Sequence, residues 1–215
     1  MSLRLFSNTV SIDSVLRAGK FHLLFICIVL QACASVPQTN SLNYDFEPLS
    51  KEDNLNYQQP NKIVISIADI SAPGTLDSNA MLYRLQYDNA QLLRPYAQHR
   101  WSMPPAQLFA QRIKSRITAA GGTAVGPADG VADLPVLKIE LDEFSQIFTN
   151  ATQSEARITL RVSLIKKNKL IAQKYFNVSK ASASADASGG AKAMQIAADD
   201  SISSILSWFQ AIPAY

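Results

Sequence analysis

Hydrophobic and polar residues alternate along several stretches of the chain, a pattern with a period of two that predicts β-strands. One stretch, residues 63–67, has isoleucine at every second position. Three longer stretches with the same period follow at residues 134–144, 156–166 and 170–178. Because only a short polar turn separates the last two, we expect them to form a β-hairpin.

Two other stretches repeat their apolar residues every three or four positions, which is typical of one-sided helices. The first begins at Pro104-Pro105 and stops at Gly121-Gly122, since proline is tolerated in the first turn and glycine favours the C-terminal end. The second covers residues 191–211. We expect both helices to cover the sheet. The alternative for the second, a stripe that binds a membrane or a partner, is less favoured because its polar face is not basic.

A second hairpin is predicted near the middle of the chain. Residues 81–87 and 91–96 read as strands on either side of the turn Asp88-Asn89-Ala90, and this hairpin is rich in tyrosine. Strands and helices in this order predict one α/β (α+β) domain, in which the helices lie on a sheet.

The first 33 residues have the composition of a secretory signal. Arg17 and Lys20 precede an apolar run at residues 21–30, which is too short to span a bilayer. The sequence Leu-Gln-Ala-Cys that ends at Cys33 resembles the bacterial lipobox. That resemblance implies a signal peptide at 1–32, a diacylglycerol on the Cys33 thiol and an acyl chain, such as palmitate, on the new N-terminus. The alternative is a cleaved signal in which the cysteine is accidental.

Residues 33–61 are predicted to be a lipid-anchored N-terminus and tether. They are rich in Ser, Asn, Gln, Thr and Pro, a composition that buries too little surface to offset the entropy of ordering. Within them, residues 44–49 are a candidate edge strand. The globular domain is expected to cover residues 62–215.

Charge argues against a nucleic-acid partner. The formal charge is +3, but residues 1–32 contain three basic residues and one acidic residue, so the mature chain is nearly neutral. Binding to phosphate backbones needs clustered Lys and Arg. The densest basic group, Lys166, Lys167 and Lys169, reads as a solvated hairpin turn.

No catalytic or metal-binding motif is evident, so we expect neither an enzyme nor a metal or other cofactor. The mature chain has one histidine, His99, and a general base needs a positioned partner. The adjacent carboxylates Asp142-Glu143 and Asp199-Asp200 point in different directions on a strand or a helix. We therefore expect both pairs to be solvated.

Over about residues 40–210 the chain resembles the ABC-type transport auxiliary lipoprotein family. The most recognisable stretch is Tyr83-Arg84, followed by Tyr96 and by Trp101, two residues and Pro104-Pro105 at a helix start. The resemblance implies a mixed sheet of about five strands with two main helices, similar to the anticodon-binding-domain-like architecture of the TolB amino-terminal domain.

The resemblance also implies a non-enzymatic lipoprotein of an MCE-type ABC transport system for intermembrane lipid transport, with a permease, an ATPase and an MCE-domain protein as partners. A homo-oligomer stays open. Ala34, which follows the lipidated cysteine, points to the periplasmic face of the outer membrane. The residues expected to bind a partner are Tyr83, Arg84, Tyr87, Tyr96 and Trp101.

Two alternatives remain open from the sequence. The aromatic residues of the hairpin are equally well explained by packing on the first helix. A periplasmic shuttle that encloses an acyl chain between the sheet and the helices is the alternative function.

Overall fold

The computed structural model describes residues 40–49 and 62–213. The predicted signal peptide, Cys33 and most of the predicted tether lie outside the described residues, so what was expected of them stays a prediction. The strands are β1 (Leu42–Tyr44), β2 (Val64–Ile67), β3 (Ala80–Leu85), β4 (Ala90–Trp101), β5 (Thr123–Val125), β6 (Val136–Asn150), β7 (Gln153–Lys166) and β8 (Lys169–Ala181). The helices are α3 (Gln86–Asn89), α4 (Pro105–Ala119) and α5 (Ala187–Ala211), with short 3-10 helices η2 (Gly74–Leu76) and η3 (Pro127–Asp129).

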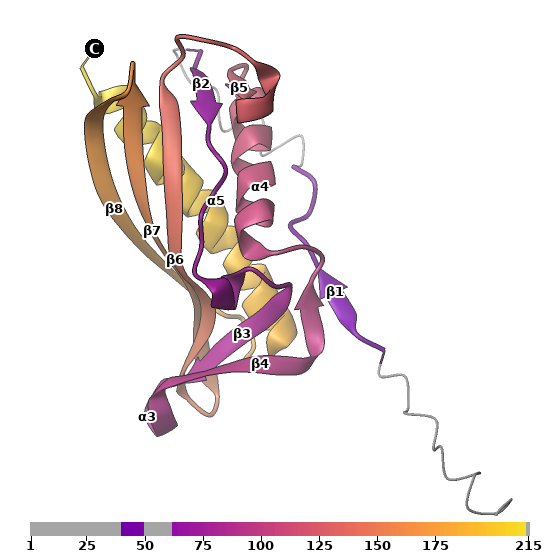
Figure 1. The fold of residues 1–215 in the computed structure, drawn as a ribbon. Helices are drawn as coiled ribbons and strands as arrows, with labels where there is room; N and C mark the ends of the chain where they lie inside the picture. The colour runs from indigo at the N-terminus through magenta and orange to yellow at the C-terminus, as the bar shows by residue number, and fades with distance from the viewer. Residues whose placement is uncertain (1–39, 50–61, 214–215) are drawn as a thin grey trace, which may run out of the picture. The chain divides into compact units, whose positions relative to one another are not determined.

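Strand β6 is the centre of the mixed sheet, and both of its edges are paired (Figure 1). One edge pairs antiparallel with β7, which pairs with β8. The other edge is shared, since its N-terminal end pairs with β2 and its C-terminal part pairs with β3, both in parallel. Strand β5 continues the sheet from β2, and β4 and β1 continue it from β3. The sheet therefore divides beyond β6 into two branches.

The main helices cover one face of this sheet, as the sequence predicts. Leu137 and Ile139 of β6 and Leu164 of β7 are fully buried, and Figure 1 shows α5 behind β6, β7 and β8. The intervening residues point to the opposite face, which we call the outer face. There Lys138 and Arg161 form ion pairs with Glu140. The mixed α+β class is confirmed.

Within the described residues the sheet has eight strands rather than about five. Strands β1 and β5 have three residues each, too few to show a period of two. Strand β6 continues to Asn150, beyond the expected end at Phe144, and residues 144–148 are all buried. Alternation therefore disappears from the sequence where both faces of the strand are covered.

Helix α5 begins at Ala187, four residues before the predicted start. Asp186 caps it, since its Oδ1 accepts a hydrogen bond from the Gly189 amide at 2.7 Å. Gly190 lies directly against the side chain of Gln146, because a Cβ there would come within 2.0 Å of the Gln146 Oε1. Gly189 and Gly190, which precede the predicted start, are therefore part of the first helical turn.

The hydrophobic core lies within one compact unit that begins at Asn40. Its buried members run from Ile63 to Leu206, and Tyr44 and Phe46 pack against them. Because the segment from Asn40 to Tyr215 contains every described core residue, it carries the interactions that it needs to fold on its own.

Candidate partner-binding hairpin and the strap beside it

Strands β3 and β4 form the predicted tyrosine-rich hairpin, at the end of the sheet opposite to β2 and β5 (Figure 1). The single turn α3 joins them. The guanidinium of Arg84 donates hydrogen bonds to the carbonyls of Ala90 and Gln91 at 3.4 and 3.3 Å and lies 3.4 Å from a carboxylate oxygen of Glu143. Arg84 therefore holds the turn of the hairpin and ties it to β6.

Aromatic rings of the hairpin gather beside β1. The ring of Tyr83 lies 4.6 Å from that of Tyr96 and 5.8 Å from that of Phe148. His99 meets Tyr96 edge-on at 5.8 Å and stacks on Tyr44 at 5.7 Å. The hydroxyl of Tyr44 also lies 3.1 Å from His99 Nδ1. The hairpin is therefore braced on one side by β6 and on the other by β1.

Gln146 of β6 connects this aromatic group to the start of α5. Its Oε1 accepts a hydrogen bond from the Tyr96 hydroxyl at 3.0 Å, and its Nε2 donates to Ser154 Oγ at 2.8 Å and to the Asp186 carbonyl at 3.0 Å. Burial, followed by electrostatic interactions with Tyr83 and Asp186, raises the pKa of the Tyr96 hydroxyl, so it stays protonated and donates. Nothing in the sequence marks Gln146 except an uncharged polar residue within an apolar strand.

The five candidate partner-binding residues differ in accessibility. Trp101 is only 1% exposed and lies edge-on to Phe46 and Phe144 at 6.1 and 5.5 Å. It is therefore a core residue, packed on Phe46 and on Phe144 of β6, and no partner reaches it in this conformation. Tyr83, Arg84 and Tyr96 are half-buried. Tyr87, at 52%, and its hairpin neighbour Leu92, at 46%, are the exposed large residues.

Residues 42–49 form a strap across the helical side of the domain. The strap lies inside the segment expected to be a tether, and its β1 part is the edge strand, two residues earlier than the candidate at 44–49. The Tyr44 carbonyl accepts a hydrogen bond from the Ser102 amide at 2.7 Å. Phe46 packs on Trp101, and the Arg112 guanidinium donates to the Glu47 carbonyl.

Arg112 belongs to a buried ion network between α4 and α5. Arg112 and Arg116, each 5% exposed, share the carboxylate of Asp199 through contacts of 2.7–3.0 Å. Burial opposes the ionisation of Asp199, but the hydrogen bonds and charges of the two arginines outweigh it and hold the pKa of the carboxyl below its usual value. The expectation that Asp199 is solvated was wrong, because α4 brings two arginines onto it.

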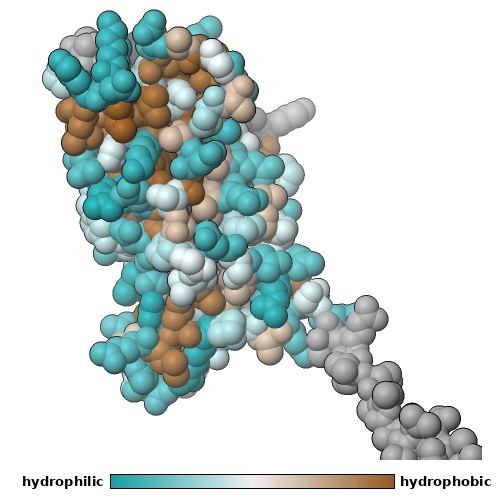
Figure 2. Space-filling view, viewed as in Figure 1, coloured by the Kyte–Doolittle hydropathy of each residue, from teal (hydrophilic) through white to brown (hydrophobic). Residues whose placement is uncertain are grey.

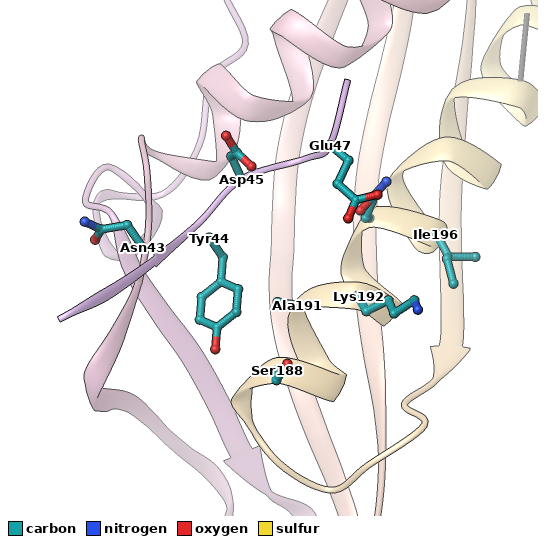
Figure 3. Close-up of a pocket in the computed structure, with 9 residues that line it drawn as sticks. Asn43, Tyr44, Asp45, Glu47, Ser188, Ala191, Lys192 and Ile196 are labelled. Carbon is teal, nitrogen blue, oxygen red and sulfur yellow. The ribbon is translucent and has the colours of Figure 1, made fainter. Parts of the chain in front are cut away.

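Two hollows flank the strap. One of about 400 Å³ is lined by Tyr44, Asp45, Glu47 and residues of the first turns of α5, including Lys192 (Figure 3). The other, of about 310 Å³, lies between the strap and α4, beside Arg112. Polar and charged groups make up much of both linings, which suits water or polar ligands better than an acyl chain.

His99 lies half-buried on strand β4 beside Tyr44. Within residues 40–49 and 62–213, no three or more His, Cys, Asp or Glu side chains come together as a metal site would require. Among the helices of the described part of the chain, none is both long enough and apolar enough to span a bilayer.

Comparison with known proteins identifies the family. The model for the ABC-type transport auxiliary lipoprotein component matches residues 44–205. A Xanthomonas campestris protein assigned to DUF330 has a similar crystal structure, with a TM-score of 0.61 at 19% identity over 69% of this chain and 85% of its own. An uncharacterized protein gives 0.62 at 12% identity over 79% and 99%. At these identities the structures show the fold alone.

No curated protein sequence matches the chain. The family model, however, extends from β1 into the last turns of α5 and so takes in the hairpin, the strap contacts and both main helices. The chain therefore belongs to the family of ABC-type transport auxiliary lipoprotein components.

Proposed function

We propose that this chain is the lipid-anchored, non-enzymatic periplasmic component of an MCE-type ABC transport system, which it links to the outer membrane for intermembrane lipid transport. The observation that carries the proposal is the family match over residues 44–205, together with the lipobox-like sequence that ends at Cys33. ATP hydrolysis and translocation then belong to the ATPase and the permease, and the MCE-domain protein is the partner that this lipoprotein contacts.

The position of the strap supports a short connection to the membrane. If Cys33 carries the lipid, only residues 34–39 separate it from Asn40, where the compact unit begins. At about 3.6 Å per residue, seven fully extended steps span at most about 25 Å. A tether that ran to residue 61 would be four times as long. The docked strap thus keeps the domain close to the bilayer that holds its anchor.

The exposed part of the β3–β4 hairpin is the surface we assign to the partner. Tyr87 and Leu92 present accessible apolar area, and the half-buried Tyr83 and Arg84 belong to strand β3 of the same hairpin. Tyrosine and arginine are enriched among the residues that dominate binding energy at protein interfaces. Tyr96 and Trp101 support the hairpin instead. Tyr96 donates a hydrogen bond to Gln146, and Trp101 packs on Phe46.

Co-purification tests the assignment. The lipoprotein is extracted from its own bacterium in mild detergent, and the MCE-domain protein that comes with it is quantified. We expect the double variant Tyr87→Ala, Leu92→Ala to lose most of that protein, because it removes the exposed side chains without touching the core. The matched control is Tyr175→Ala, Ile196→Ala, whose side chains are 58% and 46% exposed elsewhere.

Equal recovery of the MCE-domain protein with both double variants would show that the hairpin is not the interface. Absence of any MCE-domain protein from the wild-type preparation, in crosslinked as well as untreated cells, would contradict the proposed function itself. The shuttle alternative gains no support from the hollows beside the strap, since Asp45 and Glu47 line both, with Lys192 in one and Arg112 in the other.

A further inference from the structure

An apolar row crosses the outer face at the end of the sheet away from the β3–β4 hairpin. Val136 of β6 is paired with Ile165 of β7, and Ile165 with Leu170 of β8. Their neighbours Leu137 and Leu164 point into the core, so the row faces outward. Leu170 is 60% exposed, the largest exposure among the large hydrophobic residues described.

Lysines border this row. Lys166 is paired with Lys169 across the β7–β8 turn, and Lys167 forms the tip, where its φ of 50° and that of Asn168, 60°, make a tight turn. Figure 2 shows hydrophobic surface at this end of the sheet with hydrophilic residues around it. We call Val136, Ile165, Leu170 and the three lysines of the turn the end patch.

On the outer face of β6, the acidic residue nearest to the row is held by other cations. The acidic residues closest in sequence to Val136 are Asp133 and Glu140, and Glu140 is already ion-paired with Lys138 and Arg161. On the helical side of the same end, the C-terminal turns of α5 carry half-buried Trp208 and Phe209 (Figure 1). An apolar centre, a lysine border and adjacent aromatic rings are the combination that proteins place at the interface between lipid and water.

We propose that the end patch binds a membrane surface that bears anionic headgroups, a contact additional to the lipid anchor. The lysines favour a membrane over a protein partner. Protein interfaces are enriched in arginine and depleted in lysine. Clusters of lysine next to apolar residues are instead attracted to anionic leaflets. A tight turn with an exposed leucine at its base can also enter a headgroup layer. This proposal does not depend on the transport role.

Vesicle binding of the unlipidated segment 40–215, which contains the whole described core, tests the proposal. The segment is mixed with sedimenting vesicles of phosphatidylcholine, alone or with a quarter of phosphatidylglycerol. We expect binding to the second kind only, and a steep decrease with added salt, because the attraction is screened within a Debye length. The double variant Lys167→Gln, Lys169→Gln should lower the partition coefficient roughly 25-fold, at roughly fivefold for each lysine.

Matched controls distinguish binding through the end patch from nonspecific electrostatic attraction and nonspecific hydrophobic adsorption. Lys114→Gln, Lys192→Gln removes two lysines from α4 and α5, on the other side of the sheet, and should leave binding almost unchanged. Leu170→Gln should weaken binding, while Leu42→Gln, at a leucine 57% exposed on β1, should not. Circular dichroism and melting temperature confirm that each variant is folded.

Equal partition into the two kinds of vesicle would overturn the proposal, and so would equal loss in the end-patch and control variants. Either result would leave the patch as a surface for an acidic protein. Because the MCE co-purification relies on a different surface, its outcome is read separately from this one.

Discussion

Replacing Asp199 with asparagine keeps the shape of the side chain but removes the negative charge that two buried guanidinium groups share. Arg112 and Arg116 are each 5% exposed and Asp199 is 17% exposed. Removing one partner of a buried ion pair costs about 3–5 kcal/mol. Because Asp199 keeps some contact with water and asparagine still accepts one hydrogen bond, we take the lower end, about 3 kcal/mol.

For a domain of this size each kcal/mol changes the melting temperature by about 2–4 °C, so Asp199→Asn should lower it by about 6–12 °C. The matched control is Asp200→Asn, next in sequence, whose pair with Lys180 is roughly half exposed and contributes less than about 1 kcal/mol. Differential scanning calorimetry of both variants at neutral pH makes the comparison. If the two variants melted within about 2 °C of each other, the reasoning about uncompensated buried charge would be refuted.

The same network predicts a pH dependence. The pKa of Asp199 is lower in the folded state than in the unfolded chain, so its stabilisation is complete above the unfolded pKa of about 4 and is lost as the pH falls through the folded pKa. The gap in unfolding free energy between wild type and Asp199→Asn should therefore be constant near neutral pH and narrow below pH about 4. A gap that stayed constant into strong acid would show that the charge of Asp199 is not what the arginines need.

Three further changes test other parts of the molecule. Cys33→Ala should abolish acylation, and intact-mass measurement of wild type and variant checks this; an unlipidated wild type would contradict the anchor. Gly190→Ala should lower the free energy of unfolding by about 2–4 kcal/mol, because the new Cβ displaces Gln146 from its hydrogen bonds. The control Gly74→Ala, with no atom within 4 Å of its Cβ position, should change the denaturation midpoint little. Tyr96→Phe should cost about 1 kcal/mol through the lost bond to Gln146, and a neutral result in urea denaturation would mean that Gln146 is satisfied without it.

Local periodicity accounts for the parts of the fold that the sequence predicts. Residues 63–67 and the long hairpin alternate because one face of each strand is buried, and α4 begins and ends at proline and glycine. The part of β6 after Phe144 was missed, because burial on both faces leaves no period, and the edge strand β1 was placed two residues late, because three residues are too few to show one. These elements depend on what packs against them, which no short window of sequence contains.

The candidate site was predictable in outline only. The tyrosines of the hairpin were found, but Trp101 lies in the core because the strap brings Phe46 against it. The burial of Asp199 depends on arginines more than 80 positions away in the chain, and Gln146 gains its role from Tyr96 and Asp186, which are distant in sequence. Separations of this kind are set by topology and leave no local signal.

The slight attachment of the strap also has a mechanical consequence. Strand β1 is held by three residue pairs with β4, whereas β6 and β7 are joined along nearly their whole length. A pull on the chain before Asn40 is thus borne first by β1, Phe46 and the carbonyl of Glu47, and these yield while the central strands stay intact. Under load, the length of chain between the anchor and the core then increases several-fold, while the rest of the domain stays folded.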